Sequence, residues 1–245
     1  MRYYADLHIH SVLSPCADFL MTPDNIISRL KECGISIFSI TDHNACGNSR
    51  IFMQKAEENG ILFIPGIEIQ TAEEIHVVAY FNDIDVLEKV AEKIKETLPN
   101  IKNSEEIYGY QLIVDETDDY CAKEEAFLAG ASSMGIDEVA ELIRVNSGFF
   151  VPAHIDRSSS ILSNLGYIPN LEYDGFEIYG KKNISNYITK YSLNKAILCS
   201  SDAHVLGSIE KKGMYIECDK LNIELFFNEL KNNRIFIEGV ERWEL

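Results

Sequence analysis

Residues 3–11 read Tyr-Tyr-Ala-Asp-Leu-His-Ile-His-Ser, an apolar run that ends in two histidines. The run predicts a β-strand over Tyr3–Ile9, and the side-chain period of two puts His8 and His10 on the same face. In parallel α/β folds the carboxyl ends of the strands form one rim, where active sites collect. A His-x-His pair at such an end therefore indicates a site at the rim, although the pair alone is often just two exposed histidines.

The other four histidines also stand in or beside the ends of candidate strands. Their contexts are Thr41-Asp42-His43, Glu74-Ile75-His76, Pro152-Ala153-His154-Ile155-Asp156-Arg157 and Ser201-Asp202-Ala203-His204. Glu68 follows the apolar residues 64–67 in the same way. One such histidine, taken alone, is more often a core residue that has found a hydrogen-bond partner. Because all six histidines share this placement, we predict that they converge on a metal cluster.

Short apolar runs alternate with helix-like segments through most of the chain. The candidate strands are Tyr3–Ile9, Ser36–Thr41, Leu62–Ile67, His76–Tyr80, Gly148–Ala153, Gly175–Ile178, Ala196–Ser200, Met214–Glu217 and Arg234–Ile237. The candidate helices lie between Thr22 and Gly34, from Asn48 to Asn59, and over Asp85–Leu98, Asp137–Asn146 and Leu221–Asn232. Most strands lack polar alternation, as expected for strands buried on both faces. The alternation predicts a parallel α/β architecture.

One region interrupts this alternation. Between residues 99 and 135 the chain carries many acidic residues and few apolar ones. It reads either as a solvated insertion with short helices or as a mobile cover over the active site, since long connections in compact domains are often functional. Without repeats or a linker, we predict a single domain over residues 1–245 that contains this insertion.

The composition limits the partners. The net charge is −17 at pH 7, so the surface repels nucleic acid and anionic membranes at long range. We therefore expect no long nucleic-acid track and no membrane association. A phosphorylated substrate is still compatible with this charge, because bound metal ions can reverse the sign locally.

The cysteines point to a reducing compartment. The six cysteines are scattered without a Cys-x-x-Cys pair, which is typical of reduced thiols rather than of a disulfide framework or a zinc ribbon. No apolar stretch approaches the length that crosses a bilayer, and no secretion signal is evident at the N-terminus. We expect a cytoplasmic protein. The sequence does not address its oligomeric state.

Imidazoles and carboxylates are ligands suited to Zn, Mn and Fe ions. Three divalent ions would be balanced by three carboxylates, a hydroxide and a phosphate ester. Metal ions clamp phosphoryl oxygens and lower the pKa of water, so this set of ligands predicts hydrolysis of a phosphate ester by metal-activated hydroxide.

These motifs, in this order, resemble the PHP (polymerase and histidinol phosphatase) superfamily of phosphoesterases. The resemblance rests on Asp-Leu-His-Ile-His-Ser at 6–11, Thr-Asp-His-Asn at 41–44, Pro-Gly-Ile-Glu at 65–68, His76, Pro-Ala-His at 152–154 and Ser-Asp-Ala-His at 201–204. It covers nearly the whole chain. It implies a distorted (β/α)7 barrel of the PHP type, with a trinuclear metal site at the carboxyl rim of the strands.

The resemblance also implies a role for each ligand. The first metal would be held by His8, His10, Glu68 and Asp202. Glu68 would bridge to a second metal, which His76 and His154 complete. The third would be held by His43, His204 and an acid that follows the first motif. Glu68, Asp202 and His204 would be the catalytic residues among these ligands.

The third metal is where this chain departs from its relatives. Many relatives have Ser-Asp-Gly soon after the first motif, whereas residues 14–18 here read Ser-Pro-Cys-Ala-Asp. Asp18 is the candidate ligand at a shifted spacing, and the alternative is a solvated loop aspartate.

Three further residues have expected roles near the metals. We expect Asp6 and Asp42 to orient histidines or backbone rather than to bind metal. Arg157 follows His154 closely enough to reach a phosphate, and its forked guanidinium suits that task. The alternative for Arg157 is a surface ion pair with Asp156.

The sequence thus predicts a metal-dependent phosphoesterase that acts on a small phosphorylated molecule, such as a phosphomonoester, a nucleotide or a short oligonucleotide. Two alternatives stay open. A metal-dependent amidohydrolase also begins with His-x-His, but usually lacks the pair of motifs that supplies a third metal here. Some PHP domains are non-catalytic modules of a larger polymerase, but this chain has the full ligand set and no polymerase segment.

Overall fold

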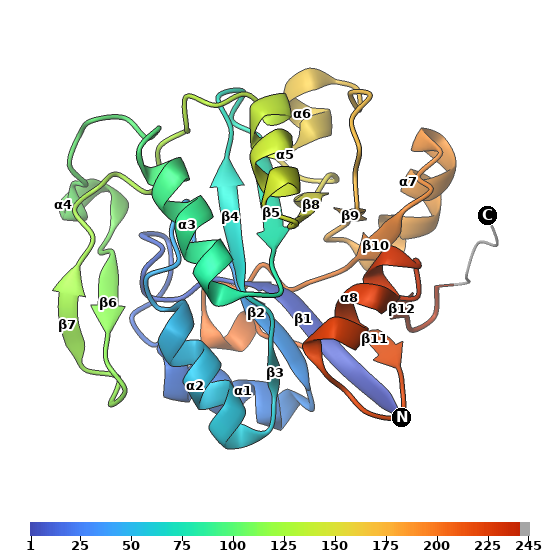
Figure 1. Cartoon of the computed structure of the whole chain (residues 1–245), viewed down its shortest axis with the longest axis horizontal. Helices are drawn as coiled ribbons and strands as arrows, with labels where there is room; N and C mark the ends of the chain where they lie inside the picture. The colour runs from blue at the N-terminus through green and yellow to red at the C-terminus, as the bar shows by residue number, and fades with distance from the viewer. Residues whose placement is uncertain (241–245) are drawn as a thin grey trace.

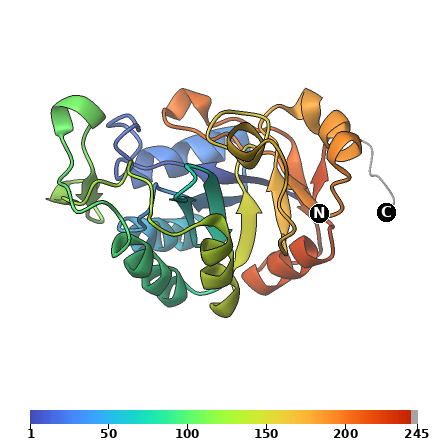
Figure 2. The same cartoon turned by 90° about the horizontal axis from the view of Figure 1, so that it is seen from above.

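The computed structural model describes residues 1–240 and shows a mixed α/β fold. Most strands run through the middle of the molecule, and helices cover them on both sides, whereas the hairpin of residues 112–123 stands at one edge (Figures 1 and 2). Helices α2, α3, α5 and α8 lie on one side, and α1, α6 and α7 on the other (Figure 2). Residues 241–245 of the expected domain lie outside the described residues.

The predicted strands are all present. They are β1 (Arg2–Ile9), β2 (Ile37–Ile40), β3 (Leu62–Phe63), β4 (Gly66–Gln70), β5 (His76–Tyr80), β6 (Leu112–Val114), β7 (Tyr120–Lys123), β8 (Phe149–Pro152), β9 (Gly175–Glu177), β10 (Ala196–Leu198), β11 (Met214–Glu217) and β12 (Phe236–Ile237). The single strand expected over 62–67 is divided into β3 and β4. The β6–β7 hairpin was not predicted, because every residue of β7 is exposed and the segment has no buried apolar face.

The five predicted helices are also present, with two more that the sequence analysis did not identify, α6 and α7. The helices are α1 (Pro23–Cys33), α2 (Ser49–Asn59), α3 (Ile84–Lys95), α4 (Glu105–Tyr108), α5 (Ile136–Val145), α6 (Ile161–Leu165), α7 (Ile184–Tyr191) and α8 (Ile223–Lys231). As expected, α1 begins with Pro23 at its first position and ends at Gly34, which has the left-handed φ of 67° that favours glycine.

The strands form four hydrogen-bonded sheets, in the orders β12-β11-β1-β2-β3, β4-β5-β8, β9-β10 and β6-β7. Neighbours β1, β2 and β3 are parallel, as predicted, and so are β9 and β10. The expectation of parallel strands is wrong for β4, β5 and β8, and for β11, which pairs antiparallel with both β1 and β12. For β4 and β5 the reason is local, because residues 71–75 between them are too few for a helical crossover.

Two isolated bridges join the sheets at the ends of β1 and β4. Ile9 pairs with Ala203, and His43 pairs with Glu68, both in parallel. Apart from such isolated bridges, the strands of residues 1–240 form four sheets, so the mixed α/β class is confirmed and a closed (β/α)7 barrel is not.

A buried tyrosine connects two of these sheets. Tyr80, at the end of β5, has no exposed surface, and its hydroxyl donates a hydrogen bond of 3.0 Å to the carbonyl oxygen of Leu7 in β1. The contact satisfies a polar group that would otherwise be costly to bury. It holds the end of β1, which carries His8, against the sheet that carries Glu68.

The acidic insertion packs on the loops that follow β1 and β2. The side-chain amide of Asn48 donates to the carbonyl oxygen of Leu112, and its oxygen accepts from the N–H of Val114, both at 3.1 Å. Gly109 lies so close to the carbonyl oxygen of Pro15 that a Cβ there would be 2.0 Å from it. The insertion therefore has one short helix, as expected, and an anchored hairpin. Its action as a mobile cover stays a prediction.

No helix within residues 1–240 combines the length and the apolar character that a membrane span requires.

Gly66 sets the distance between β4 and β2, and this yields a test of the packing. A Cβ at Gly66 would lie 2.3 Å from Ser39 Oγ and 3.0 Å from Thr41 Cγ2. We expect Gly66→Ala to lower the free energy of unfolding by about 1–3 kcal/mol, because the strands would have to separate. Gly207 has open space around its Cβ position, so Gly207→Ala is the matched control. Urea unfolding of the two variants measures the difference, and equal stabilities would contradict this account of the packing.

Candidate metal centre

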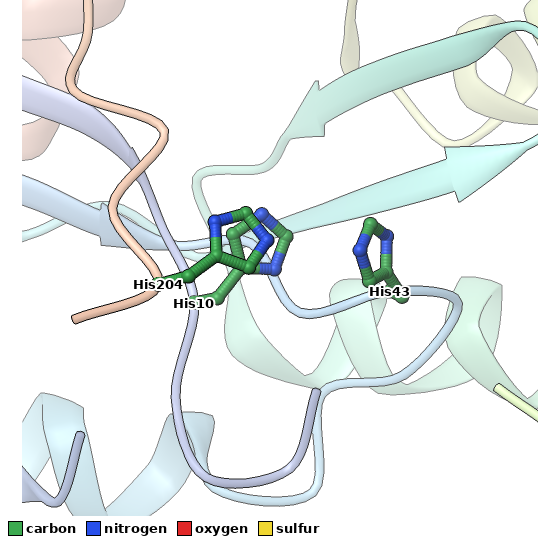
Figure 3. Close-up of side chains that lie close together, drawn as sticks. All are labelled: His10, His43 and His204. Carbon is green, nitrogen blue, oxygen red and sulfur yellow. The ribbon is translucent and has the colours of Figure 1, made fainter. Parts of the chain in front are cut away.

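Histidines from distant parts of the chain meet at one place. Three groups of side chains have ligand atoms that all lie within 4.8 Å of one another: His10, His43 and His204; His8, His10 and Glu68; and His43, Glu68 and His76. Figure 3 shows the first group, which combines the segment after β1, the segment after β2 and the loop around residue 204. The predicted convergence of the histidines is therefore present.

The carboxylate of Glu68 lies at the centre of this cluster and is 1% exposed. Its oxygens face the nearest nitrogens of His43 and His76 at 3.0 Å, of His8 and His154 at 3.3 Å and of His10 at 3.4 Å. Burial by itself would raise the pKa of Glu68, but His76, His8 and His43 outweigh it and hold the pKa well below its usual range. Glu68 is thus an ionised carboxylate that is shared by several imidazoles, as a bridging ligand would be.

The antiparallel pairing explains how His76 reaches Glu68. His76 begins β5, and β5 runs antiparallel to β4, with His76 opposite Gln70. The amino end of β5 therefore lies at the same edge as the carboxyl end of β4. In an all-parallel sheet, the amino end of this strand would face the opposite edge.

Hydrogen bonds to the outer nitrogens of His8 and His10 leave their inner nitrogens free to bind a cation. His8 Nδ1 is 2.9 Å from Glu177 Oε2, so it donates to that carboxylate. His10 Nδ1 is 2.9 Å from the hydroxyl oxygen of Ser14, which itself donates to Asp42. If both imidazoles are neutral and each carries its proton on Nδ1, each Nε2 has a free lone pair. The two Nε2 atoms are 3.2 Å apart, so these lone pairs converge on one point.

Asp202 adds a second carboxylate at this point. Its Oδ1 lies 3.5 Å from His8 Nε2 and 3.4 Å from His10 Nε2. Burial by itself would raise the pKa of Asp202, but His8 and His10 lower it overall. Asp202 has φ 50° and His154 has φ 27°, values that are unfavourable for residues with a side chain. Such strain at two predicted ligands suits a functional site.

Glu177 supports the site but was not predicted. Its Oε2 accepts from both His8 Nδ1 and the backbone N–H of His154, and the residue is 1% exposed. It thus fixes the orientation of one predicted ligand and the backbone of another. The available signal was an acidic residue within the otherwise apolar candidate strand Gly175–Ile178.

Asp6 and Asp42 hold backbone, in line with the sequence analysis. Asp42 accepts from the N–H of Ser11 at 2.7 Å and from the hydroxyls of Ser11 and Ser14 at 2.6 Å. Asp6 accepts from the N–H of Ser201 at 2.9 Å, and burial raises the pKa of Asp6 to about 6. These bonds order the loops that carry His10 and Asp202.

Asp18 lies in the loop beside the cluster. Its N–H donates to the carbonyl oxygen of His204 at 2.8 Å, and its carboxylate accepts from the N–H of Leu20 at 2.8 Å. Within residues 1–240 neither Asp18 nor Cys16 belongs to the three groups of ligand atoms, and the role of Asp18 as a metal ligand stays a prediction. Burial would raise the pKa of the Cys16 thiol, but hydrogen bonds with His204 and His43 lower it to about 7.

Arg157 pairs with Asp202 rather than with Asp156. Its Nη1 is 2.6 Å from Asp202 Oδ2, whereas the oxygens of Asp156 accept from the backbone N–H groups of Tyr179 and Gly180. The Arg157 guanidinium also lies 4.3 Å from the centre of the Tyr179 ring. Arg157 therefore sits at the edge of the cluster, next to a predicted ligand.

These donors fit divalent metal ions. Glu68 Oε2 is buried and has no hydrogen-bond partner within residues 1–240, although two imidazoles face it. Burying such an oxygen without a partner is costly unless a cation binds it. Imidazole nitrogens and carboxylate oxygens are the ligands of Zn, Mn and Fe, so the residues present could hold such ions.

Comparisons with known proteins agree with the geometry. The family model described as PHP domain matches residues 6–238. Over 84 residues the chain is 33% identical to the 5'-3' exoribonuclease Rnm of Salmonella typhimurium, a match that covers 32% of this chain and 28% of that protein.

Two solved structures share the fold. The lesion-specific endonuclease EndoQ of Pyrococcus furiosus has a TM-score of 0.67 at 18% identity, over 95% of this chain and 56% of that chain. An amidohydrolase from Chromobacterium violaceum has a TM-score of 0.58 at 18% identity, over 96% of this chain and 98% of that chain. The chain thus spans only part of the exoribonuclease and of the endonuclease, and at these identities the structural likeness concerns the fold alone.

The position of Glu177 gives a test of the site. We expect Glu177→Gln to weaken metal binding about 10–100-fold, because His8 loses the carboxylate that orients its ring. Glu217→Gln is the control, since the Glu217 side chain is half exposed on β11 and pairs with Arg2. Equilibrium competition with a chelator, read out by elemental analysis, measures both variants. Unchanged metal affinity in Glu177→Gln would remove Glu177 from the site.

Proposed function

Because this chain belongs to the PHP domain family, we propose that it hydrolyses a phosphate ester with the help of divalent metal ions. The observation that carries the proposal is the buried carboxylate of Glu68, which faces five imidazoles. When bound, such ions clamp phosphoryl oxygens and lower the pKa of water, which is the chemistry that phosphate ester hydrolysis needs. The distorted (β/α)7 barrel that the resemblance implies stays part of this proposal.

The proposed ligand set follows the convergence of side chains. The first ion would be held by His8, His10, Glu68 and Asp202, the second by Glu68, His76 and His154, and the third by His43, His204 and Asp18. His204 Nδ1 bonds to the carbonyl oxygen of Asp202 at 2.9 Å, which leaves Nε2 for a metal. In this scheme Glu68, Asp202 and His204 are catalytic because they hold the ions in the geometry that hydrolysis requires.

Arg157 is proposed to bind the phosphate. Its side chain is 45% exposed, so it can leave Asp202 partly and reach a ligand at the metals. Lys212 lies over the same Tyr179 ring at 3.4 Å, so two cations meet beside the cluster. The chain has a net charge of −17, so this pair of cations beside the cluster supports binding of a small, anionic substrate.

Exposed aromatic rings support a nucleotide or short oligonucleotide as the substrate. Phe19 and Tyr110 are 51% and 41% exposed, and their ring centroids are 5.3 Å apart. Phe19 directly follows Asp18, whose N–H bonds to the carbonyl oxygen of His204, so Phe19 lies on the loop that borders the metal cluster, and Tyr110 meets it from the insertion. Nucleobases stack on such side chains without sequence preference.

The names of the similar proteins agree with this substrate class. An exoribonuclease and an endonuclease both cleave phosphodiester bonds, which belong to the proposed class of ester. The amidohydrolase is similar in fold alone, so an amide substrate stays an outcome of the test below. We also propose a cytoplasmic location, since all six cysteines are unpaired.

The proposed function predicts metal-dependent turnover. Hydrolysis of a phosphomonoester, a dinucleotide or a short oligonucleotide should require Mn, Fe or Zn and stop on chelation. Glu68→Gln should lower the rate at least ~10³-fold, because the amide weakens two metal positions at once. Glu57→Gln, on the exposed face of α2, is the matched control. A screen of the metal-analysed protein against these substrates measures the rates.

Two results would overturn this proposal. Near-full activity of Glu68→Gln with unchanged metal content would remove Glu68 from its bridging role. Turnover of amides without turnover of phosphate esters would favour the amidohydrolase alternative, and no turnover of any substrate by metal-loaded protein would favour a non-catalytic module.

Arg157 gives a separate test of substrate binding. We expect Arg157→Ala to raise KM about 10–100-fold with little change in kcat, because a charge-assisted hydrogen bond to the phosphate is lost. Arg157→Lys should restore the affinity only in part, since lysine keeps the charge but not the fork. Steady-state kinetics at matched metal occupancy decide, with Arg50→Ala as the control for an exposed ion-paired arginine. Wild-type constants in Arg157→Ala would leave Arg157 with only the ion pair to Asp202.

A further inference from the structure

Two cations gather on the ring of Tyr179 at the edge of the metal cluster. The guanidinium carbon of Arg157 is 4.3 Å from the centre of the ring, and the ammonium nitrogen of Lys212 is 3.4 Å from it. No more than twice the longer distance therefore separates the two cations. Arg157 Nη1 also bonds to Asp202 Oδ2 at 2.6 Å, so the pair of cations adjoins a proposed metal ligand.

The backbone of Tyr179 is fixed on both sides. Its N–H donates to Asp156 Oδ1 at 2.8 Å, and its carbonyl oxygen accepts from Lys212 Nζ at 3.2 Å. Tyr179 also follows β9, which carries Glu177, and Glu177 Oε2 accepts from His8. The ring and the two cations on it therefore have a defined place relative to the first proposed metal position.

Lys212 carries a charge that no carboxylate neutralises. It is partly buried, and within residues 1–240 it makes no ion pair, although the chain has 39 acidic and 22 basic residues. The nearby Asp156 is engaged otherwise, since its oxygens accept from N–H groups of Tyr179, Gly180 and Asn183. Charged side chains that leave water are usually paired. The unmatched charge of Lys212 therefore marks a place for an anion.

The neighbouring Lys211 has a different environment. Its ammonium nitrogen lies 3.2 Å from the centre of the Tyr4 ring. The hydroxyl of Tyr4 donates to Glu238, so a carboxylate lies beside that ring. Tyr4 is near the amino end of β1, whereas His8 is near its carboxyl end. Lys211 is thus a lysine on a tyrosine ring away from the metal cluster, which makes it a matched control for Lys212.

We propose that Lys212, positioned by the ring of Tyr179, binds a second phosphate of the substrate, one that is not cleaved. This inference rests on the proposed function, in which the reacting phosphate lies at the metals beside Arg157. An ammonium group is a point charge that suits a phosphate oxygen, and the two cations are close enough to bind neighbouring phosphates of one molecule. The site thus favours a substrate with two phosphates over a lone phosphomonoester.

Steady-state kinetics on matched substrates tests this inference. The 5'-phosphorylated thymidine dinucleotide carries two phosphates, whereas thymidine 5'-monophosphate and the unphosphorylated dinucleotide each carry one of them. We expect the wild type to have a lower KM for the two-phosphate substrate. Lys212→Ala should raise that KM about 10–100-fold with little change in kcat, because a charge-assisted hydrogen bond is lost. It should affect the one-phosphate substrates much less, and Lys211→Ala should behave as the wild type.

A second pair of substrates identifies the source of the second phosphate. Fructose 1,6-bisphosphate and fructose 6-phosphate differ by one phosphate and have no nucleobase. A difference in KM that is confined to the nucleotides supports a nucleotide strand as the substrate. A difference between the two sugars that Lys212→Ala removes supports the same role of Lys212 with a sugar bisphosphate.

Variants at residues 179 and 212 separate positioning from general stability. Tyr179→Phe keeps the ring and should keep the preference for two phosphates. Tyr179→Leu keeps the carbonyl oxygen but removes the ring, and should raise KM for the two-phosphate dinucleotide about 2–5-fold. Lys212→Arg keeps the charge and should restore much of the preference. A lysine that only fastens its loop to Tyr179 would instead lower the melting temperature of Lys212→Ala and affect all substrates equally.

The outcomes distinguish this inference from the proposed function. Loss of the two-phosphate preference in Lys212→Ala but not in Lys211→Ala supports the role of Lys212. A wild type that hydrolyses esters without this preference, or an equal effect of Lys212→Ala on all substrates, would overturn that role and leave the proposed function standing. If the metal-loaded wild type hydrolyses none of them, calorimetry with the two-phosphate dinucleotide decides. Binding that Lys212→Ala weakens would keep the anion site alone, and absent or unaffected binding would overturn both proposals.

Discussion

The buried carboxylate of Glu68 determines where several strands and loops of this molecule must end. Glu68 is 1% exposed, and it faces five imidazoles from four segments of the chain, which hold its pKa well below the usual range. Removing a charge from water is costly unless partners of opposite charge replace the water. The strands and loops that carry the histidines therefore have to end close to Glu68, and this requirement explains the arrangement of the loops at the ends of β1, β2 and β8.

Several features that are unfavourable by themselves serve this arrangement. Gly66 lets β4 approach β2 closely, and His154 and Asp202 adopt positive φ values. Buried Glu177, Asp42 and Asp6 then hold the ligand side chains and their backbone. Strained backbone and buried charges of this kind persist only where many surrounding interactions compensate their energetic cost. The same groups would fix the orientation of each imidazole before a metal binds, which lowers the cost of assembling the centre.

Much of this could be predicted from the sequence. The nine candidate strands, the five helices and the convergence of six histidines on Glu68 and Asp202 follow from local patterns, since apolar runs and strand ends depend on neighbours in the chain. The misses also have a common origin. Strand β7 is exposed along its whole length, and the short loop of residues 71–75 reverses β5, which periodicity does not show.

The sequence by itself determined which residues are candidate ligands, because the identity of each residue and its place at a strand end are local properties. Only the tertiary structure decided which of them meet. His8 bonds to Glu177 across 169 positions in the chain, and Arg157 pairs with Asp202 rather than with its neighbour Asp156. The N–H of Asp18, in the loop after β1, donates to the carbonyl oxygen of His204, which lies 186 positions further along the chain. The physical reason is that such contacts depend on the directions of side chains from elements that pack together, and spacing along the chain does not contain those directions.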